Sequence, residues 1–440
     1  MGISVLDFPV DSSIRTEDWQ PDKYPIAVGD DCIYLLKHIK NPRIIKVDLA
    51  NQTTLVSNMI GSALGYAGEV AVWPFRNGRK RNGDLFMDCL VMDYSETAGS
   101  RNLYLRRIYV DPTDLTISAD TQRTLTGSAD LTAGTVGLRI LKYGETLIWT
   151  VFKETKEDYA IKIDLHGMRY QTVEIDTSTN DWSDNWRHFC DLLVDRTTNK
   201  LYILSAVYYW LPGSYKVMEI VDPCTLTQVA YTTDYDSGCG DVCVRRYYRD
   251  SVGKVRYYHV GNSGAVTYTS HFGTFYADND ALVVETEVTI DDTYKDYSCG
   301  NTAPIPLGIT SDNKIAWLLI GGSAARNDQP SSGYTSGFQL ITTNDTFGSP
   351  TKITSATYSV TTSDYRAGDK RPYIYLREAD WCYYAPDEIL ASSPQDKWKW
   401  GKLDLADTGI TITQDDPYEV IIVPKTGLIP TTLTLQITPL

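Results

Sequence analysis

The sequence predicts an all-β protein in which a unit of four short antiparallel strands is repeated seven times. A polar or glycine-containing turn followed by an apolar, aromatic run recurs along the 440 residues. A second run, which ends at or near an aspartate, follows each of these. The 31 Tyr and 10 Trp also favour strands, because aromatic side chains suit a pleated, half-buried surface. Helical periodicity is nearly absent, and only the segment APDEILASS predicts a short helix.

The first signal is a hairpin turn that opens a strand. In TTNKLYILSAVYYW, residues 197–210, a polar turn leads into a long apolar run. Gly, Asn and Asp in such turns supply the unusual backbone angles that a tight hairpin requires. The copies are GDDCIYLLK at 29, NGDLFMDCLVM at 82, YGETLIWTVF at 143, TNKLYILSAVYYW at 198, VGKVRYYHV at 252, DNKIAWLLIGG at 312 and EADWCYYAP at 378.

The second signal is a strand that ends at an aspartate, as in RIIKVDLANQT and YAIKIDLHG. The carboxylate of such an aspartate can accept backbone N–H bonds two residues on and so close a turn. We therefore predict that these aspartates form turns and are not acids or bases. They are Asp48, Asp111, Asp164, Asp222, Asp278, Asp345 and Asp404.

Each unit also contains a short apolar run before the hairpin turn and another run after the aspartate, which makes four predicted strands. The predicted units span residues 25–60, 66–125, 135–177, 188–233, 241–290, 303–355 and 370–415. One four-stranded unit cannot bury its faces alone, so a long internal period predicts units that pack side by side. Residues 1–24 are predicted as an N-terminal extension. Residues 416–440 contain two more strand-like runs, which either close the ring or form an arm that adds to a neighbour's sheet edge.

On these repeats, residues 25–415 resemble a seven-bladed β-propeller, particularly the type with a repeated viD…t strand end. The chain lacks the Trp-Asp and Gly-His signatures of WD40 repeats and the double glycine of kelch repeats. It also resembles the propellers found in virus and phage virions. The rival fold is a pair of β-sandwich domains, but a period sustained seven times argues against it.

Charge and hydropathy exclude several kinds of partner. The net charge of −15 speaks against nucleic acid, which requires a clustered basic face. The basic cluster RNGRKR at 76–81 is predicted to be a solvated turn. The N-terminus lacks the pattern of a secretory signal, and no apolar run reaches the ~18 residues of a spanning helix. We therefore expect synthesis in a cytoplasm and no membrane insertion.

The sequence contains no pattern that names a reaction. The eight cysteines are scattered without CxxC, so no zinc site is predicted, and several are expected to be small buried hydrophobes. The five histidines show no HExxH, and neither GxSxG nor a phosphate loop is present. We predict no catalytic residue and no cofactor. The sequence does not decide whether the protein is an enzyme, but it favours a noncatalytic role.

Candidate binding residues lie in the loops between units and between second and third strands, which share one face in propellers. Tyr and Trp beside carboxylates could stack on and hydrogen-bond a sugar, or could form a protein interface. Asp234 and Asp236 are also the candidates for calcium, although DYDSGCGD departs from the calcium-loop pattern. The candidates are Asp181, Trp182, Asp184, Trp186, Tyr209, Trp210, Asp234, Tyr235, Asp236, Tyr294, Asp296 and Tyr297.

Three functions follow from these observations. The first, which the resemblance to virion propellers implies, is a noncatalytic subunit of a tail or capsid surface that binds neighbouring protein subunits or a host surface. The second is a carbohydrate-active propeller that binds or cleaves glycans with the aromatic and acidic loops. The third is a cytoplasmic scaffold for protein interactions.

Overall fold

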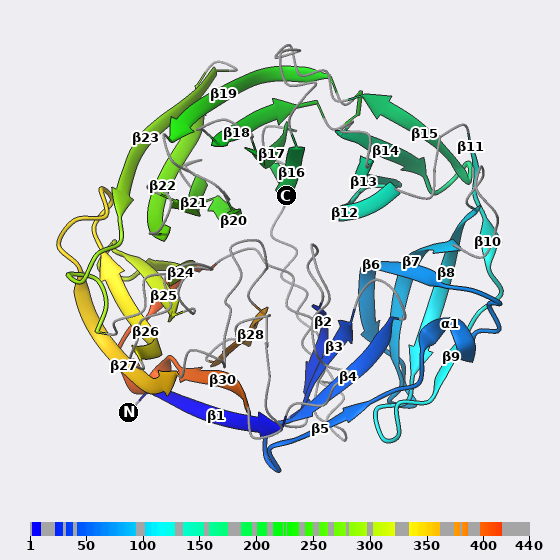
Figure 1. Ribbon diagram of the computed structural model, residues 1–440, viewed down its shortest axis with the longest axis horizontal. Helices are drawn as coiled ribbons and strands as arrows, with labels where there is room; N and C mark the ends of the chain where they lie inside the picture. Colours follow the sequence, from blue (N-terminus) through cyan, green and yellow to red (C-terminus); the bar gives the residue numbers. More distant parts are fainter. Residues whose placement is uncertain are drawn as a thin grey trace.

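The structure, a computed structural model, is a ring of β-sheets (Figure 1). The described residues pair in seven sheets, so the predicted all-β propeller class is confirmed. These residues are 2–9, 23–29, 32–37, 42–93, 102–127, 135–153, 158–174, 186–195, 200–208, 214–222, 224–225, 227–236, 243–249, 255–262, 268–278, 281–296, 302–321, 334–360, 374–378, 381–385 and 397–415.

The inner and second strands of each sheet form a hairpin. From the first sheet along the chain to the last, the inner strands of these hairpins are β2 (Lys23–Gly29), β6 (Val70–Arg79), β12 (Thr135–Tyr143), β16 (Trp186–Asp195), β20 (Cys243–Arg249), β24 (Thr302–Thr310) and β28 (Ile374–Glu378). The second strands are β3 (Cys32–Lys37), β7 (Leu85–Asp93), β13 (Thr146–Lys153), β17 (Lys200–Tyr208), β21 (Val255–Asn262), β25 (Ile315–Gly321) and β29 (Trp381–Ala385).

The third and fourth strands complete the sheets toward the rim. The third strands are β4 (Arg43–Asp48), β8 (Asn102–Val110), β14 (Asp158–Asp164), β18 (Ser214–Val221), β22 (Tyr268–Asp278), β26 (Tyr334–Thr343) and β30 (Lys397–Asp404). The outer strands are β5 (Thr53–Val56), β9 (Ile117–Ala119) with β10 (Arg123–Thr124), β15 (Arg169–Glu174), β19 (Gln228–Asp236), β23 (Ala281–Thr289), β27 (Thr351–Val360) and, for the last sheet, β1 (Ile3–Pro9). β11 (Thr126–Gly127) adds in parallel to β15.

Contacts between neighbouring sheets establish the ring. β2 contacts β6, and the series continues through β12, β16 and β20 to β24, while β28 contacts β2. Because consecutive strands are antiparallel, the turns that join first to second and third to fourth strands lie at one face of the ring, here called the turn face. The ends of the second strands and of the outer strands lie at the opposite face, here called the loop face.

Six of the inner strands contain one extra residue relative to the second strand. Such a bulge bends the strand and increases its twist. Prolines, which cannot donate a ladder hydrogen bond, are tolerated there because the inner strand is an edge. The register shifts occur at Pro25/Ala27, Pro74/Arg76, Gly137/Arg139, Phe189/Asp191, Arg245/Tyr247 and Pro306/Gly308.

The hydrophobic cores lie between adjacent sheets, because each sheet packs on both faces. In β7, Met87 and Cys89 face a core shared with the sheet of β2–β5, whereas Leu90 and Met92 face one shared with the sheet of β12–β15. Trp73 of β6 meets Trp149 of β13 in that second core, with ring centroids 4.7 Å apart. The apolar runs of the sequence therefore pack against neighbouring sheets. Cys32 and Cys89 are buried, as expected, and burial raises the pKa of the Cys89 thiol well above its usual range.

Aspartates close the turns at five of the seven predicted positions. Oδ1 of Asp111 accepts the N–H of Thr113 at 2.7 Å, and Oδ1 of Asp222 accepts that of Cys224 at 2.7 Å. Asp164 and Asp404 likewise accept the N–H two residues on, at 2.9 and 3.1 Å, and Asp48 accepts the N–H of Asn51, three residues on, at 2.9 Å. In the sixth sheet the prediction was wrong by one residue, because Asn344 accepts the N–H of Thr346 in place of Asp345. In the fifth, Asp278 pairs directly with Ala281 across a tight hairpin.

Two lysines, missed in the sequence, join neighbouring sheets beside these turns. Nζ of Lys46 donates to the carbonyl of Pro112, 2.9 Å away, in the next sheet's turn. Nζ of Lys162 donates to the carbonyl of Cys224 in the same way. Each lysine stands two residues before its turn aspartate, Asp48 or Asp164. At this position each lysine side chain reaches a backbone carbonyl in the turn of the next sheet.

The first strand of the chain closes the ring. Residues 1–24 were expected to lie outside the repeat, but β1 pairs antiparallel with β30 from Ile3↔Leu403 to Pro9↔Lys397. In Figure 1 the blue β1 lies beside the orange β30, and β1 also contacts β27 and β5. The last sheet thus takes its outer strand from the opposite end of the sequence.

The last described strand also departs from the prediction. The run GITIT at 409–413 was expected to be the fourth strand of the last unit. Instead β31 (Ile412–Asp415) pairs with β24 of the preceding sheet, from Gly308↔Asp415 to Thr310↔Ile412. Pairing begins just beyond the Pro306/Gly308 bulge, where inner-edge donors are again present.

The helical content of the described residues is small. α1 (Ile60–Ala63) and a short 3₁₀ turn at Ala406–Thr408 were not predicted. Most of the predicted helix APDEILASS lies outside the described residues. No helix among the described residues is long and apolar enough to cross a membrane.

The turn carboxylates predict a loss of stability in acid. Backbone N–H groups of Gly167 and His166 lower the pKa of Asp164, and the N–H of Thr225 lowers that of Asp222 although burial opposes it. A carboxyl whose folded pKa lies below its unfolded value of about 3.9 stabilises the fold above that pH. That stabilisation is lost as the pH falls through the folded pKa. We expect the melting temperature to fall below about pH 4.

The variant Asp222→Asn tests this expectation, because its amide oxygen can still accept the turn N–H but does not titrate. The difference in melting temperature between the native chain and Asp222→Asn should shrink as the pH falls from 5 to 2. A constant difference across that range would contradict the role of the ionised carboxylate.

Candidate functional site

The structure describes half of the predicted binding residues. Trp186 begins β16, and Asp234, Tyr235 and Asp236 end β19. Tyr294 and Asp296 lie between β23 and β24. The remaining candidates lie outside the described residues; they are Asp181, Trp182, Asp184, Tyr209, Trp210 and Tyr297.

Four of the described candidates lie at the loop face of the fourth sheet, Trp186 on its inner strand and residues 234–236 on its outer strand. Trp186 pairs with Tyr208 at the end of β17, and Asp236 pairs with Ser214 at the start of β18. Residues 232–236 were predicted as a loop between units, which was wrong, because they continue the outer strand β19.

The connection after β23 enters the space between two sheets. The connection begins with a turn at Asp291. Oδ1 of Asp291 accepts two bonds from Thr293, from the backbone N–H at 2.8 Å and from the side-chain hydroxyl at 2.6 Å. The hydroxyl bond, and to a smaller extent the N–H bond, lowers the pKa of Asp291, although burial acts in the opposite direction. The turn directs Ile290 and Tyr294 inward, where both are buried.

Tyr294 is a packing residue in this arrangement. Its ring lies 5.3 Å from that of Phe272, centroid to centroid, in the core between the fifth and sixth sheets. Its hydroxyl donates to the carbonyl of Phe347, 3.0 Å away, in the β26–β27 turn. The side chain that was expected to face a ligand is thus enclosed between sheets.

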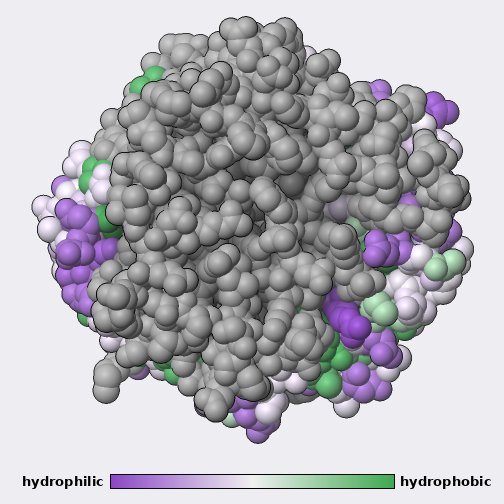
Figure 2. Space-filling view, in the orientation of Figure 1, coloured by the Kyte–Doolittle hydropathy of each residue, from purple (hydrophilic) through white to green (hydrophobic). Residues whose placement is uncertain are grey.

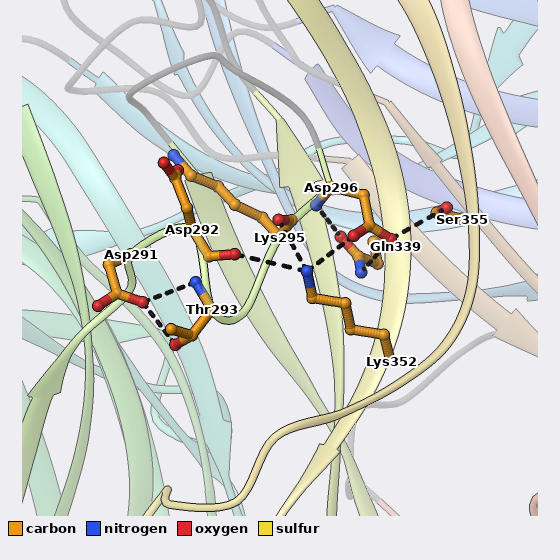
Figure 3. Close-up of polar contacts among 8 residues, drawn as sticks. All are labelled: Asp291, Asp292, Thr293, Lys295, Asp296, Gln339, Lys352 and Ser355. Atoms are coloured by element: carbon orange, nitrogen blue, oxygen red, sulfur yellow. Dashed lines mark hydrogen bonds and ion pairs between the residues drawn. The ribbon is translucent and has the colours of Figure 1, made fainter.

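Asp296 is held against the sixth sheet (Figure 3). Its backbone N–H donates to Oε1 of Gln339 at 2.8 Å, and Nε2 of Gln339 donates to Oδ2 of Asp296 at 3.0 Å. Nζ of Lys352 lies 2.7 Å from Oδ1 of Asp296 and also donates to the carbonyl of Lys295 at 3.1 Å. The carboxylate, 43% exposed, is therefore ion-paired with Lys352 and hydrogen-bonded to Gln339, and it cross-links the connection to β26–β27.

Removing the hydroxyl of Tyr294 should reduce stability. Tyr294→Phe leaves the carbonyl of Phe347 without this donor in a buried position, which typically costs about 1–3 kcal/mol. Chemical denaturation should show this loss with an unchanged fold. The matched control is Tyr66→Phe, whose hydroxyl donates to Gln122 in an exposed position and accepts from Arg106 in a half-buried one, and which should cost less than Tyr294→Phe because neither partner is fully buried. Equal stability of Tyr294→Phe and the native chain would return Tyr294 to the binding candidates.

The described residues contain no group of three or more His, Cys, Asp or Glu that could hold a metal ion. The calcium candidates Asp234 and Asp236 lie two residues apart at the end of β19. Among the described residues, Leu55 and Val229 on outer strands are the large hydrophobic side chains that are exposed. Figure 2 shows one face of the ring, where the described residues appear mainly around the rim with hydrophilic and hydrophobic ones interspersed.

Sequence reasoning missed Gln339 and Lys352, which give Asp296 its partners. Gln339 lies 43 residues and Lys352 56 residues after Asp296 in the chain, so no local pattern links them to it. The lysines before the turn aspartates do have a signal, since Lys-x-Asp recurs at Lys46, Lys162 and Lys402.

Comparisons with known proteins find similar folds among solved structures. No protein-family model and no curated protein matches the chain. The WD40 domain of SCAP from fission yeast is 8% identical with a TM-score of 0.39, over 88% of this chain and 82% of that one. The polysaccharide lyase Uly1 is 8% identical with a TM-score of 0.44, over 91% and 97%. A puromycin hydrolase is 12% identical with a TM-score of 0.41, over 88% and 57%. Scores this low say nothing about activity.

Proposed function

We propose that the chain is a noncatalytic structural and interaction protein, a seven-bladed propeller subunit of a large assembly. We place it in the tail or capsid surface of a virion, where it binds neighbouring subunits or a host surface. The observation that supports this proposal is the closure of the last sheet by β1. Each of the seven sheets is then one blade.

This closure bears on residues 416–440. Two roles remained for that segment, ring closure or an arm, and β1 already supplies the outer strand of the last sheet. The segment's sequence holds the strand-like runs EVIIV and TTLTLQIT. A strand-forming tail attached to a completed ring suits the addition of a strand to the sheet edge of a neighbour. The proposal assigns the segment to that role.

The test compares the full chain with a variant that ends at residue 415. The variant should retain the melting temperature of the full chain, because its ring is complete, but should lose association in sedimentation velocity at 500 mM NaCl. High salt suppresses charge-driven contacts, so the comparison isolates the arm. A full chain that stays monomeric at every concentration, or a variant that associates equally, would contradict the arm.

Imaging of particles from the source organism tests the virion proposal. The chain should occupy repeated, symmetric positions on the particle surface. Its absence from purified particles, together with glycan binding that depends on Trp186 or Asp234, would favour the carbohydrate-active alternative.

A further inference from the structure

The hairpin of β6 and β7 places a basic cluster at the turn face. Arg76 and Arg79 end β6, Lys80 and Arg81 lie in the turn, and Arg107 lies beside them on β8. The sequence predicted a solvated turn over 76–81. Residues 76–79 instead continue β6, and the turn that follows exposes Lys80 and Arg81, with the N–H of Lys80 donating to the carbonyl of Asp84 at 2.8 Å.

Cation–aromatic and ion-pair contacts hold this basic cluster in shape. Nζ of Lys80 lies 3.2 Å from the centroid of Tyr109, whose hydroxyl donates to the Asp120 carboxylate at 3.0 Å. Arg107 binds Asp88 through two bonds of 2.6 and 2.9 Å. These contacts limit the side-chain entropy that a partner would otherwise have to remove on binding.

The charges within the cluster do not balance. Asp88 accepts from Nε and Nη2 of Arg107, whereas Arg76 approaches it only to 3.9 Å with 60% of its side chain exposed. Asp84 lies 4.0 Å from Nζ of Lys80 in the same turn. Arg81 is exposed at the tip of the turn. Arg76 and Arg81 therefore present positive charge to the outside of a protein whose net charge is −15.

The turns of the other sheets place many carboxylates on the turn face, beside fewer cations, of which Lys314 pairs with Asp312 at 3.0 Å. Exposed or half-buried carboxylates occur there in the first-to-second and third-to-fourth strand turns of the other sheets. Those described are Asp48, Glu145, Asp164, Asp222, Asp312, Asp345, Asp404 and Asp407. Turn N–H groups and Thr hydroxyls hold several of them ionised, and one ionised carboxylate can still accept further bonds.

We infer that the turn face is a self-complementary interface, in which the basic hairpin of one copy docks on the acidic turns of a second copy. This inference rests on the proposed role in an assembly and names one contact of it. A two-fold axis parallel to the turn face repeats the contact, so the hairpin of each copy meets the acidic turns of the other and the contact occurs twice in one dimer. Opposed charges of this kind fix orientation and speed association.

Sedimentation velocity at 50 and 500 mM NaCl tests the interface in the chain that ends at residue 415, so that the arm does not contribute. We expect self-association at 50 mM that weakens at least 10-fold at 500 mM, because salt screens exposed charges. Arg81→Glu and Arg76→Glu should each weaken it at least 10-fold at 50 mM with unchanged melting temperature. The matched control is Arg123→Glu, an exposed charge reversal on β10 at the rim, which should leave association unchanged.

Zero-length cross-linking of a mixture of ¹⁴N- and ¹⁵N-labelled chains locates the contact. Amide bonds between Lys80 and turn carboxylates of the other isotope are expected. A monomer at 50 mM NaCl, association insensitive to Arg81→Glu, or binding of nucleic acid without self-association would each overturn the inference. The arm at 416–440, tested separately at high salt, would be untouched by such results.

Discussion

A chain lacking residues 2–9 is expected to lose its closed ring and much of its stability. β1 forms seven register pairs with β30, and it buries Ile3 in a core shared with the sixth sheet and Phe8 against Trp400. Without β1, β30 becomes an unprotected edge of the kind that pairs with other chains. We expect a melting temperature at least 10 °C lower, or aggregation, since several kcal/mol are lost and each shifts the midpoint by a few degrees.

A point variant and a peptide give two further measurements. Phe8→Ala removes a fully buried ring that meets Trp400 edge-on at 6.4 Å, and should cost about 3–5 kcal/mol. Ser4→Ala, an exposed position on the same strand, should change stability by less than about 0.5 kcal/mol. A synthetic peptide of residues 1–10 should raise the melting temperature of the truncated chain, because it supplies the missing strand. A truncated chain that melts with the native one would refute closure by β1.

The position of β1 also shows where sequence reasoning ended. A hairpin such as NGDLFMDCLVM is specified by residues that lie next to one another, so turn chemistry and alternation suffice to predict it. The Asp turns are equally local, and the shift from Asp345 to Asn344 reflects two adjacent residues that can both accept the turn N–H. β1 pairs with residues almost 400 positions away, and nothing in the sequence ISVLDFP names that partner.

The candidate site was harder to predict for a related reason. Asp, Tyr and Trp in a connection look alike in sequence whether they face solvent or a neighbouring sheet. Tyr294 and Asp296 face the sixth sheet because Asp291 turns the chain inward and Lys352 receives the carboxylate. The contacts that decided their roles are formed only when the fifth and sixth sheets come together.

The same principle, that stability resides between sheets, predicts a large and coupled effect for one pair of tryptophans. Trp73 and Trp149 are almost fully buried, belong to neighbouring sheets and meet at a tilt of 56°. Each replacement by Ala should cost about 3–5 kcal/mol, because a large cavity opens in a shared core. The double variant should cost less than the sum by about 0.5–1.5 kcal/mol, the usual coupling of a contacting aromatic pair.

A matched pair separates coupling from general destabilisation. Trp317 is equally buried but lies in the core between the fifth and sixth sheets, with no residue in common with the Trp73 core. Trp73→Ala combined with Trp317→Ala should therefore be additive to within about 0.5 kcal/mol. Replacements by Phe give the same cycle with smaller losses if an Ala variant fails to fold. Additive losses for Trp73 and Trp149 would contradict this expectation. They would mean that the stability of the ring arises mainly inside each sheet and little from the contacts between sheets.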